Sequence, residues 1–269
     1  MRHPVADIGR LLEGLYARLN KPEFIHPDPL EFLHDYPDMR DREIVGFIAS
    51  SLAYGRVSQI LKSTSCILDQ MGSSPRLFLE STSRESLNKL FSCFKHRFTT
   101  GEELVDFLIA IKSVIEVHGS LRQCFLMHYS LDDPDITGPL ELFVYEIKSY
   151  LHIKENSLLP CPEKGSACKR LHLFLRWMVR SDEVDPGGWD EISPSKLIVP
   201  LDVHMHRICL AIGMTSRKQA DLKTAIEITQ RFRSYMPEDP VRYDFALTRT
   251  GIRNDLDPTE IMDYRYKTM

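Results

Sequence analysis

The sequence lacks long apolar runs, closely spaced cysteine pairs and strand-like alternation. No apolar run approaches the roughly 18 residues that a membrane-spanning helix needs. Segment 1–21 is amphipathic and has neither the compact apolar stretch nor the cleavage site of a signal peptide. The six cysteines include no C-x-x-C pair, which argues against a disulfide framework and against a zinc or iron–sulfur site. We therefore expect a cytoplasmic protein that binds no membrane, metal or cofactor.

The composition is that of a globular protein. Of the 269 residues, 43% are hydrophobic and 27% are charged, and there are no internal repeats. The net charge of −4 counts against general nucleic-acid binding. One segment departs from this average, because 164–180 carries five positive charges and no acidic residue.

Nearly every periodic stretch has the period of a helix. Thr100 and Glu103 form a predicted capping box, and Asp239 is a predicted N-cap. Strand signals are nearly absent, which predicts an all-α protein of about nine to eleven helices. Segment 181–195 is the one long irregular connection, and such loops are often functional. The clearest predicted helices are 41–55, 56–72, 100–119, 136–151, 202–213, 215–236 and 239–251.

Asp202 stands at the start of one of these helices. The stretch Val199-Pro200-Leu201 disfavours helix, and Asp is a preferred N-cap residue. Asp202 is then either a cap only or a cap that also takes part in catalysis. A carboxylate that accepts backbone N–H groups at a helix tip stays ionised, so it is a poor general acid but can stabilise a developing positive charge.

The basic segment begins with a proline-rich turn. Gly165 leads into a helix on which Lys169, His172, Arg176 and Arg180 share one side. A glycine turn that feeds a helix N-terminus suits a phosphate group, because backbone N–H groups there are free. The alternative is an ordinary solvated basic face of an amphipathic helix.

The order of these pieces resembles the helix-hairpin-helix DNA glycosylases. Four stretches carry the likeness, which covers about residues 40–255: "EIVGFIASSLAYGRVSQIL", "LPCPEKGSACKRLHLFL", "VPLDVHMHRI" and "DPVRYDFALTRTGI". The separation of 33 residues between Lys169 and Asp202 is most similar to the archaeal 8-oxoguanine DNA glycosylases. The stretch "DPGGWDEISPSKLIVPLDVHMHR" also resembles an uncharacterised family of bacterial conserved hypothetical proteins.

This resemblance implies a helix-hairpin-helix glycosylase-like fold, with two helical lobes and a cleft between them. It implies an N-terminal helical extension at 1–40, a helical lobe at 41–160, and a part at 161–269 that holds the hairpin and the Asp202 helix. The function would be base-excision repair of double-stranded DNA that carries an oxidised purine such as 8-oxoguanine. The protein would act as a monomer.

The resemblance also implies roles for single residues. Asp202 and Lys169 would be catalytic, with the lysine forming a Schiff base for strand cleavage. Residues implied to contact DNA are Lys164, Gly165, Ser166, Arg170, Arg176, Arg180, His204 and Arg207. Residues implied to line a base pocket are Ser51, Trp177, Trp189, Tyr243, Phe245 and Arg249.

Two other functions remain open at this stage. The hairpin keeps only Gly165 of the usual glycines, and a strict alignment puts Ala167 rather than Lys169 at the lysine position. A non-catalytic helix-hairpin-helix module that binds nucleic acid through phosphates is therefore one alternative. The other is an all-helical scaffold for protein interaction, in which Asp202 is only a cap.

Overall fold

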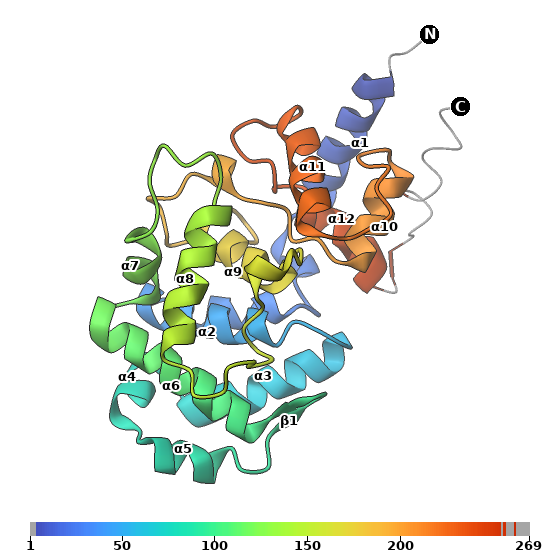
Figure 1. Ribbon diagram of the computed structural model, residues 1–269. Helices are drawn as coiled ribbons and strands as arrows, with labels where there is room; N and C mark the ends of the chain where they lie inside the picture. Colours follow the sequence, from blue (N-terminus) through green and yellow to red (C-terminus); the bar gives the residue numbers. More distant parts are fainter. Residues whose placement is uncertain (1–3, 254, 257–260, 262–269) are drawn as a thin grey trace. The chain divides into compact units, whose positions relative to one another are not determined.

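The computed structural model describes residues 4–253, 255–256 and 261, and these fold as two compact units. Unit 1 combines residues 1–27 with 164–269, and unit 2 comprises residues 28–163. The described residues form twelve α-helices, four short 3-10 helices and one two-stranded sheet (Figure 1). The prediction of a mostly helical protein is confirmed.

Unit 2 contains seven of the α-helices and the sheet. Its helices are α2 (Met39–Ser51), α3 (Val57–Met71), α4 (Pro75–Ser81), α5 (Arg84–Leu90), α6 (Gly101–His118), α7 (Leu121–Leu126) and α8 (Thr137–Ser149). The 3-10 helix η2 (Pro29–Asp35) precedes α2, and η3 (Pro162–Lys164) lies across the boundary between unit 2 and unit 1. Strands β1 (Lys95–His96) and β2 (Thr99–Thr100) pair antiparallel, with Lys95 opposite Thr100 and His96 opposite Thr99.

Aromatic rings and buried acids hold unit 2 together. Phe47 on α2 lies 5.1 Å from Phe107 on α6 and 5.9 Å from Phe143 on α8, measured between ring centroids. Glu43 is fully buried on α2, and its carboxylate accepts hydrogen bonds from the backbone N–H groups of Leu121 and Arg122 at 2.9 and 3.0 Å. This carboxylate satisfies the free N–H groups at the start of α7, which offsets the cost of its burial.

Unit 1 joins the two ends of the chain. Its elements are α1 (Pro4–Leu19), η1 (Pro22–Phe24), α9 (Lys169–Val179), η4 (Pro194–Lys196), α10 (Val203–Ala211), α11 (Leu222–Arg233) and α12 (Asp244–Ile252). Figure 1 shows α1, in blue, beside the red α12. The leucines at 12, 15 and 19 on α1 are at most 2% exposed, so the amphipathic start of the sequence buries its apolar face inside this unit.

Several predicted elements are confirmed. The Thr100–Glu103 capping box is present at α6, with both reciprocal hydrogen bonds formed. The helices predicted at 56–72, 100–119 and 136–151 correspond to α3, α6 and α8. The predicted number of helices was too low, because α4, α5 and α7 are only six or seven residues long. Helices this short carry too little periodicity to be detected from sequence.

Two predicted helix starts in unit 1 were wrong. The helix expected from 215 begins only at Leu222, because Asp221 accepts a hydrogen bond from the Thr224 N–H and acts as the N-cap. The helix expected from 239 begins at Asp244, and Asp239 is not its cap. Instead, the Asp239 carboxylate is paired with Arg180 at 2.9 Å. Asp239 therefore pairs with a residue that is distant in the sequence and does not cap the helix that follows it.

Candidate functional site

Lys169 and Asp202 meet in unit 1. Lys169 is the first residue of α9, and Asp202 is the N-cap of α10. One Asp202 carboxylate oxygen, Oδ1, accepts the Met205 N–H at 2.8 Å, while Oδ2 lies 3.2 Å from Lys169 Nζ. The lysine and aspartate side chains are 32% and 35% exposed, so solvent and ligands can reach the pair.

The surroundings keep Asp202 ionised. Burial alone would raise its pKa, but the Lys169 ammonium and the Met205 N–H outweigh that effect and hold the pKa below the ordinary value. The predicted N-cap is confirmed, and the predicted anionic state of this carboxylate has a physical cause. At neutral pH the pair can place a negative and a positive charge side by side at a helix tip.

A buried ion-pair network follows Lys169 along α9. Arg176 contacts the carboxylates of Asp185 and Asp244, and Arg180 contacts those of Asp182, Asp185 and Asp239. Two guanidinium groups thus face four carboxylates. This excess of negative charge favours a proton on the most deeply buried acids, and burial raises the pKa of both Asp185 and Asp244 against the opposing effect of the arginines.

Asp244 connects this network to the Lys169–Asp202 pair. It lies at the start of α12 and is 3% exposed. One of its oxygens contacts Arg176, and the other has no hydrogen-bond partner among the described residues. The charges of Asp202 and Lys169 both act on its pKa, in opposite directions and more weakly than burial does. Sequence analysis missed this residue, because only the fold brings α12 near α10.

Arg176 and Arg180 do not lie on a solvated basic face, which was one of the two interpretations of this segment. They are 2% and 3% exposed, and His172 is 2% exposed. Helical periodicity correctly put them on one side of α9, but that side faces carboxylates instead of solvent. Both arginines are engaged in ion pairs inside unit 1, and this placement leaves them unavailable to a phosphate backbone.

The glycine turn before α9 is present but has an unexpected environment. Gly165 has a φ of 71°, a left-handed conformation that glycine adopts readily. Ser166 pairs with Asp221 in an isolated bridge, and the Leu222 N–H donates to the Gly165 carbonyl at 3.3 Å. The turn is therefore tied to the start of α11. Gly165 and Ser166 are exposed, and the predicted contact residue Lys164 has a side chain outside the described part of the structure.

The other predicted DNA contacts lie near the pair. Arg170 is half-buried beside Lys169, and Arg207 is exposed on α10. His204 is half-buried and packs so tightly against Gly251 of α12 that an added Cβ there would lie 1.8 Å from its Nε2 atom. Gly251 thus permits the close approach of α10 and α12.

The predicted base-pocket residues do not form an open pocket. Trp177, Trp189, Tyr243, Phe245 and Arg249 are each at most 1% exposed and belong to the core of unit 1. Their neighbours are core side chains as well: Phe174 lies 5.2 Å from Trp189, and the Arg249 guanidinium lies 4.1 Å from the Phe245 ring. Ser51 is also buried, and it belongs to unit 2.

The described residues contain neither a candidate metal-binding cluster nor a candidate membrane-spanning helix. No group of three or more His, Cys, Asp or Glu side chains in this part of the chain is placed to hold a metal ion. Within the same residues, no helix combines the length and the apolarity that crossing a membrane requires.

Comparison with known proteins identifies the family. Residues 28–253 match the model of a family described as "Protein of unknown function (DUF2400)". The chain belongs to the DUF2400 family. No curated protein and no solved structure matches it. The predicted resemblance to an uncharacterised family is thereby confirmed, whereas no comparison links the DUF2400 chain to the helix-hairpin-helix glycosylases.

The family match bears on the two units differently. It covers the whole of unit 2 and the part of unit 1 that contains Lys169, Asp202 and Asp244. It begins at residue 28, so α1 lies outside the match although it packs against α12.

Proposed function

We propose that this DUF2400 chain is a DNA N-glycosylase with an associated lyase activity, acting as a monomer on double-stranded DNA that carries an oxidised purine. The observation that supports it is the 3.2 Å contact between Lys169 Nζ and Asp202 Oδ2 at the tip of α10. An amine and an ionised carboxylate, both partly exposed, are the two groups that this chemistry requires. The helix-hairpin-helix glycosylase-like fold, with its two lobes, is part of the hypothesis.

The reaction would divide between these two residues. As the bond between C1′ and the base nitrogen breaks, its electrons leave with the base, which takes up a proton, and positive charge develops at C1′. Asp202 stabilises that charge. Lys169 Nζ, after giving up a proton, attacks C1′. The C1′–O4′ bond then breaks and O4′ takes up a proton, which opens the sugar ring and leaves a protonated Schiff base between Nζ and C1′. Loss of a proton from C2′ then drives β-elimination, in which the C3′–O bond breaks and the 3′ phosphate leaves. The target base must first leave the stack at a cost of a few kcal/mol.

The burial of two arginines changes the proposed DNA contacts. Arg176 and Arg180 are occupied inside unit 1, so the phosphates would meet the exposed turn at Gly165 and Ser166, together with Arg170, Arg207 and His204. A small number of cationic contacts predicts weak, salt-sensitive binding to DNA. The nature of the base remains tied to the spacing between hairpin and aspartate, which favours 8-oxoguanine.

Borohydride trapping tests this proposal. The full chain is incubated with short duplexes that carry 8-oxoguanine or an abasic site, and a covalent protein–DNA band is expected. Lys169→Gln should abolish the band. Asp202→Asn should lower base release by at least about a hundredfold while retaining the fold, since asparagine also caps helices. Lys223→Gln, which alters an exposed lysine on α11, is the matched control and should leave the band unchanged.

A non-catalytic nucleic-acid-binding module is the second candidate. One observation favours it: Asp202 already has a structural role, because it caps α10 and pairs with Lys169. Salt-sensitive binding of duplexes by the wild-type chain and by Asp202→Asn, with no trapped band and no base release, would establish this function and refute the glycosylase.

A further inference from the structure

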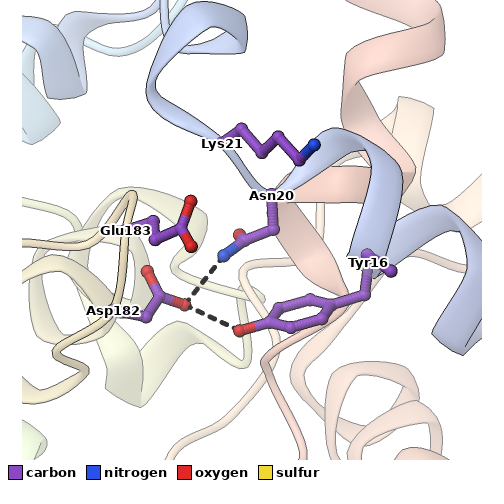
Figure 2. Close-up of a pocket in the computed structure, with 6 residues that line it drawn as sticks. Tyr16, Asn20, Lys21, Asp182 and Glu183 are labelled. Carbon is purple, nitrogen blue, oxygen red and sulfur yellow. Dashed lines mark hydrogen bonds between the residues drawn. The ribbon is translucent and has the colours of Figure 1, made fainter.

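Two surface features lie outside the proposed DNA chemistry, an open pocket in unit 1 and a hairpin tip in unit 2. In the pocket, the Tyr16 hydroxyl and the Asn20 amide donate hydrogen bonds to Asp182 at 3.1 and 3.0 Å (Figure 2). These polar groups of the pocket wall bind one another and so stabilise the wall. The hairpin tip, by contrast, presents to solvent an aromatic ring and cations that no described residue neutralises.

The tip of the β1–β2 hairpin consists of Arg97 and Phe98. Because His96 pairs with Thr99, these two residues alone join the strands. Two-residue hairpin turns favour asparagine and glycine, which adopt left-handed conformations readily. Arg97 nevertheless has a φ of 54°, and Phe98 is 63% exposed. The tip therefore keeps a strained cation and an exposed ring, residues that the turn itself does not favour.

The Phe98 ring is one half of a stacked pair. Its centroid lies 5.1 Å from that of the Tyr54 ring, with an angle of 24° between the two planes. Tyr54 is held in turn, because its hydroxyl donates to the His96 carbonyl at 3.2 Å and the His96 ring packs edge-on against it at 4.6 Å. One face of Phe98 is thus covered by a fixed ring, and the other face is open to solvent.

Two segments without acidic residues meet at this hairpin. Segments 44–68 and 86–101 contain no Asp or Glu, although the whole chain has 38 of them. His96 joins the segments, since its Nδ1 lies 2.9 Å from Ser63 Oγ and its Nε2 lies 3.1 Å from the Tyr54 carbonyl oxygen. Figure 1 shows β1 beside α3, which belongs to the first segment. Positive charge on this surface is therefore not offset from within either segment.

Exposed cations without an ion-pair partner among the described residues lie on these segments: Arg56, Lys62, Lys95 and Arg97. A further exposed lysine, Lys89, is paired with Glu85. The Arg97 side chain lies against the turn that precedes α3, where a Cβ added to Gly55 would be 2.8 Å from Arg97 Cδ. Glycine at position 55 thus permits this guanidinium to lie beside the turn that carries both Tyr54 and Arg56.

We propose that this surface binds an unpaired stretch of single-stranded DNA. The open face of the Phe98 ring stacks on a base, and Arg56, Lys95 and Arg97 contact the neighbouring phosphates. Single-stranded nucleic acid combines flat, accessible rings with regularly spaced negative charge, and proteins bind it through aromatic and basic side chains together. The bases of a duplex are covered by their neighbours, so the Phe98 ring selects an unpaired strand. The choice of DNA over RNA rests on the proposed function.

Fluorescence anisotropy with a labelled oligothymidylate of about twelve nucleotides tests the proposal on the full chain. An abasic strand of the same length has the phosphates without the bases, and it should bind at least about tenfold more weakly. Phe98→Ala should weaken binding of the thymidylate by about tenfold, and Phe98→Trp should preserve it. Leu77→Ala, at another position of unit 2 that is 63% exposed, should change it by less than about twofold.

The salt dependence tests the cations separately. Arg97→Gly removes a charge, but glycine adopts the left-handed turn readily, so the hairpin should stay folded. The slope of log affinity against log salt should then fall by about 0.7. Arg40→Gln removes a cation that is already paired with Asp38, and the slope should not change.

Three outcomes would overturn the inference or a part of it. Equal affinities for the thymidylate and the abasic strand would overturn it, as would unchanged binding in Phe98→Ala. Tighter binding of an oligouridylate of the same length would overturn the choice of DNA. The undamaged strand needs no base release, so Asp202→Asn should bind it as the wild-type chain does. A chain that binds the thymidylate through Phe98 but gives no trapped band would refute the glycosylase and keep this surface.

Discussion

Asp202 shows how one side chain can serve structure and chemistry together. Its backbone is extended, with a φ of −117°, and its carboxylate spans the Met205 N–H on one side and Lys169 on the other. The capping role follows from residue type and local pattern alone. The contact with Lys169 joins two residues that are 33 positions apart along the chain, and only the fold can establish it.

The cap can be measured apart from the chemistry. Asp202→Ala should lower the free energy of unfolding by about 1 kcal/mol, because the Met205 N–H loses its acceptor, whereas Asp202→Asn should lower it by a few tenths. Urea denaturation at pH 7 measures both. Equal losses in the two variants would mean that the charge, and not the cap, supplies the stability.

Asp182 should make the stability of unit 1 depend on pH. Burial alone would raise its pKa, but Arg180 and the N–H groups of Val184 and Asp185 lower it to about 2. A carboxylate whose folded-state pKa is depressed stabilises the fold above its unfolded value near 4, and this contribution is lost as the pH falls through the folded value. The contribution at neutral pH is on the order of 2 kcal/mol.

Asp182→Asn should therefore have a lower free energy of unfolding than the wild-type chain at pH 7. The difference between the two free energies, here called the gap, should narrow between about pH 4 and pH 2. Denaturant unfolding across that range measures the gap. Asp190→Asn, at an exposed position of the same segment, controls for the loss of a surface charge. A gap that stays constant down to pH 2 would contradict the assignment.

At the scale of elements, α9 illustrates what periodicity can and cannot reveal. The sequence predicted a helix here and correctly put Lys169, Arg176 and Arg180 on one side of it. It could not reveal that side's neighbours, because Asp239 and Asp244 are about 60 residues or more away along the chain. A basic stripe looks the same in sequence whether it faces solvent or buried acids.

The buried network predicts a large effect of one substitution. Arg176→Met should destabilise the chain by about 3–5 kcal/mol, because the buried Asp244 would lose the guanidinium that it contacts and Asp185 would lose one of its two arginines. Arg207→Met, on the exposed side of α10, should cost less than about 1 kcal/mol. Chemical denaturation compares the two, and similar small losses would show that Arg176 is not part of a buried network.

At the scale of the whole molecule, helical content and most long helices could be predicted from the sequence. The chain segments that together make up unit 1 could not be predicted from it. Segment 1–40 was predicted to be an extension, yet residues 1–27 belong to the same unit as the C-terminal helices. Arg253 donates to the carbonyls of Glu23 and His26 at 3.1 and 2.7 Å, and such backbone contacts leave no trace in residue patterns.

Removal of residues 1–20 should therefore damage unit 1 although the family match begins at residue 28. Three buried leucines of α1 would be lost, each worth about 1.5–3 kcal/mol. Limited proteolysis of the truncated chain should cut within 164–253 much faster than in the full chain. Cleavage within unit 2 should not change, and equal acceleration in both units would contradict this division.

The discontinuity of unit 1 also sets an order of events during synthesis. Unit 2 is one continuous segment and can fold as soon as the ribosome has released it. Helix α1 leaves the ribosome before unit 2, whereas α12 leaves after it. The apolar face of α1 therefore stays exposed to solvent until α12 has been translated. We expect chaperones to bind this helix on the nascent chain.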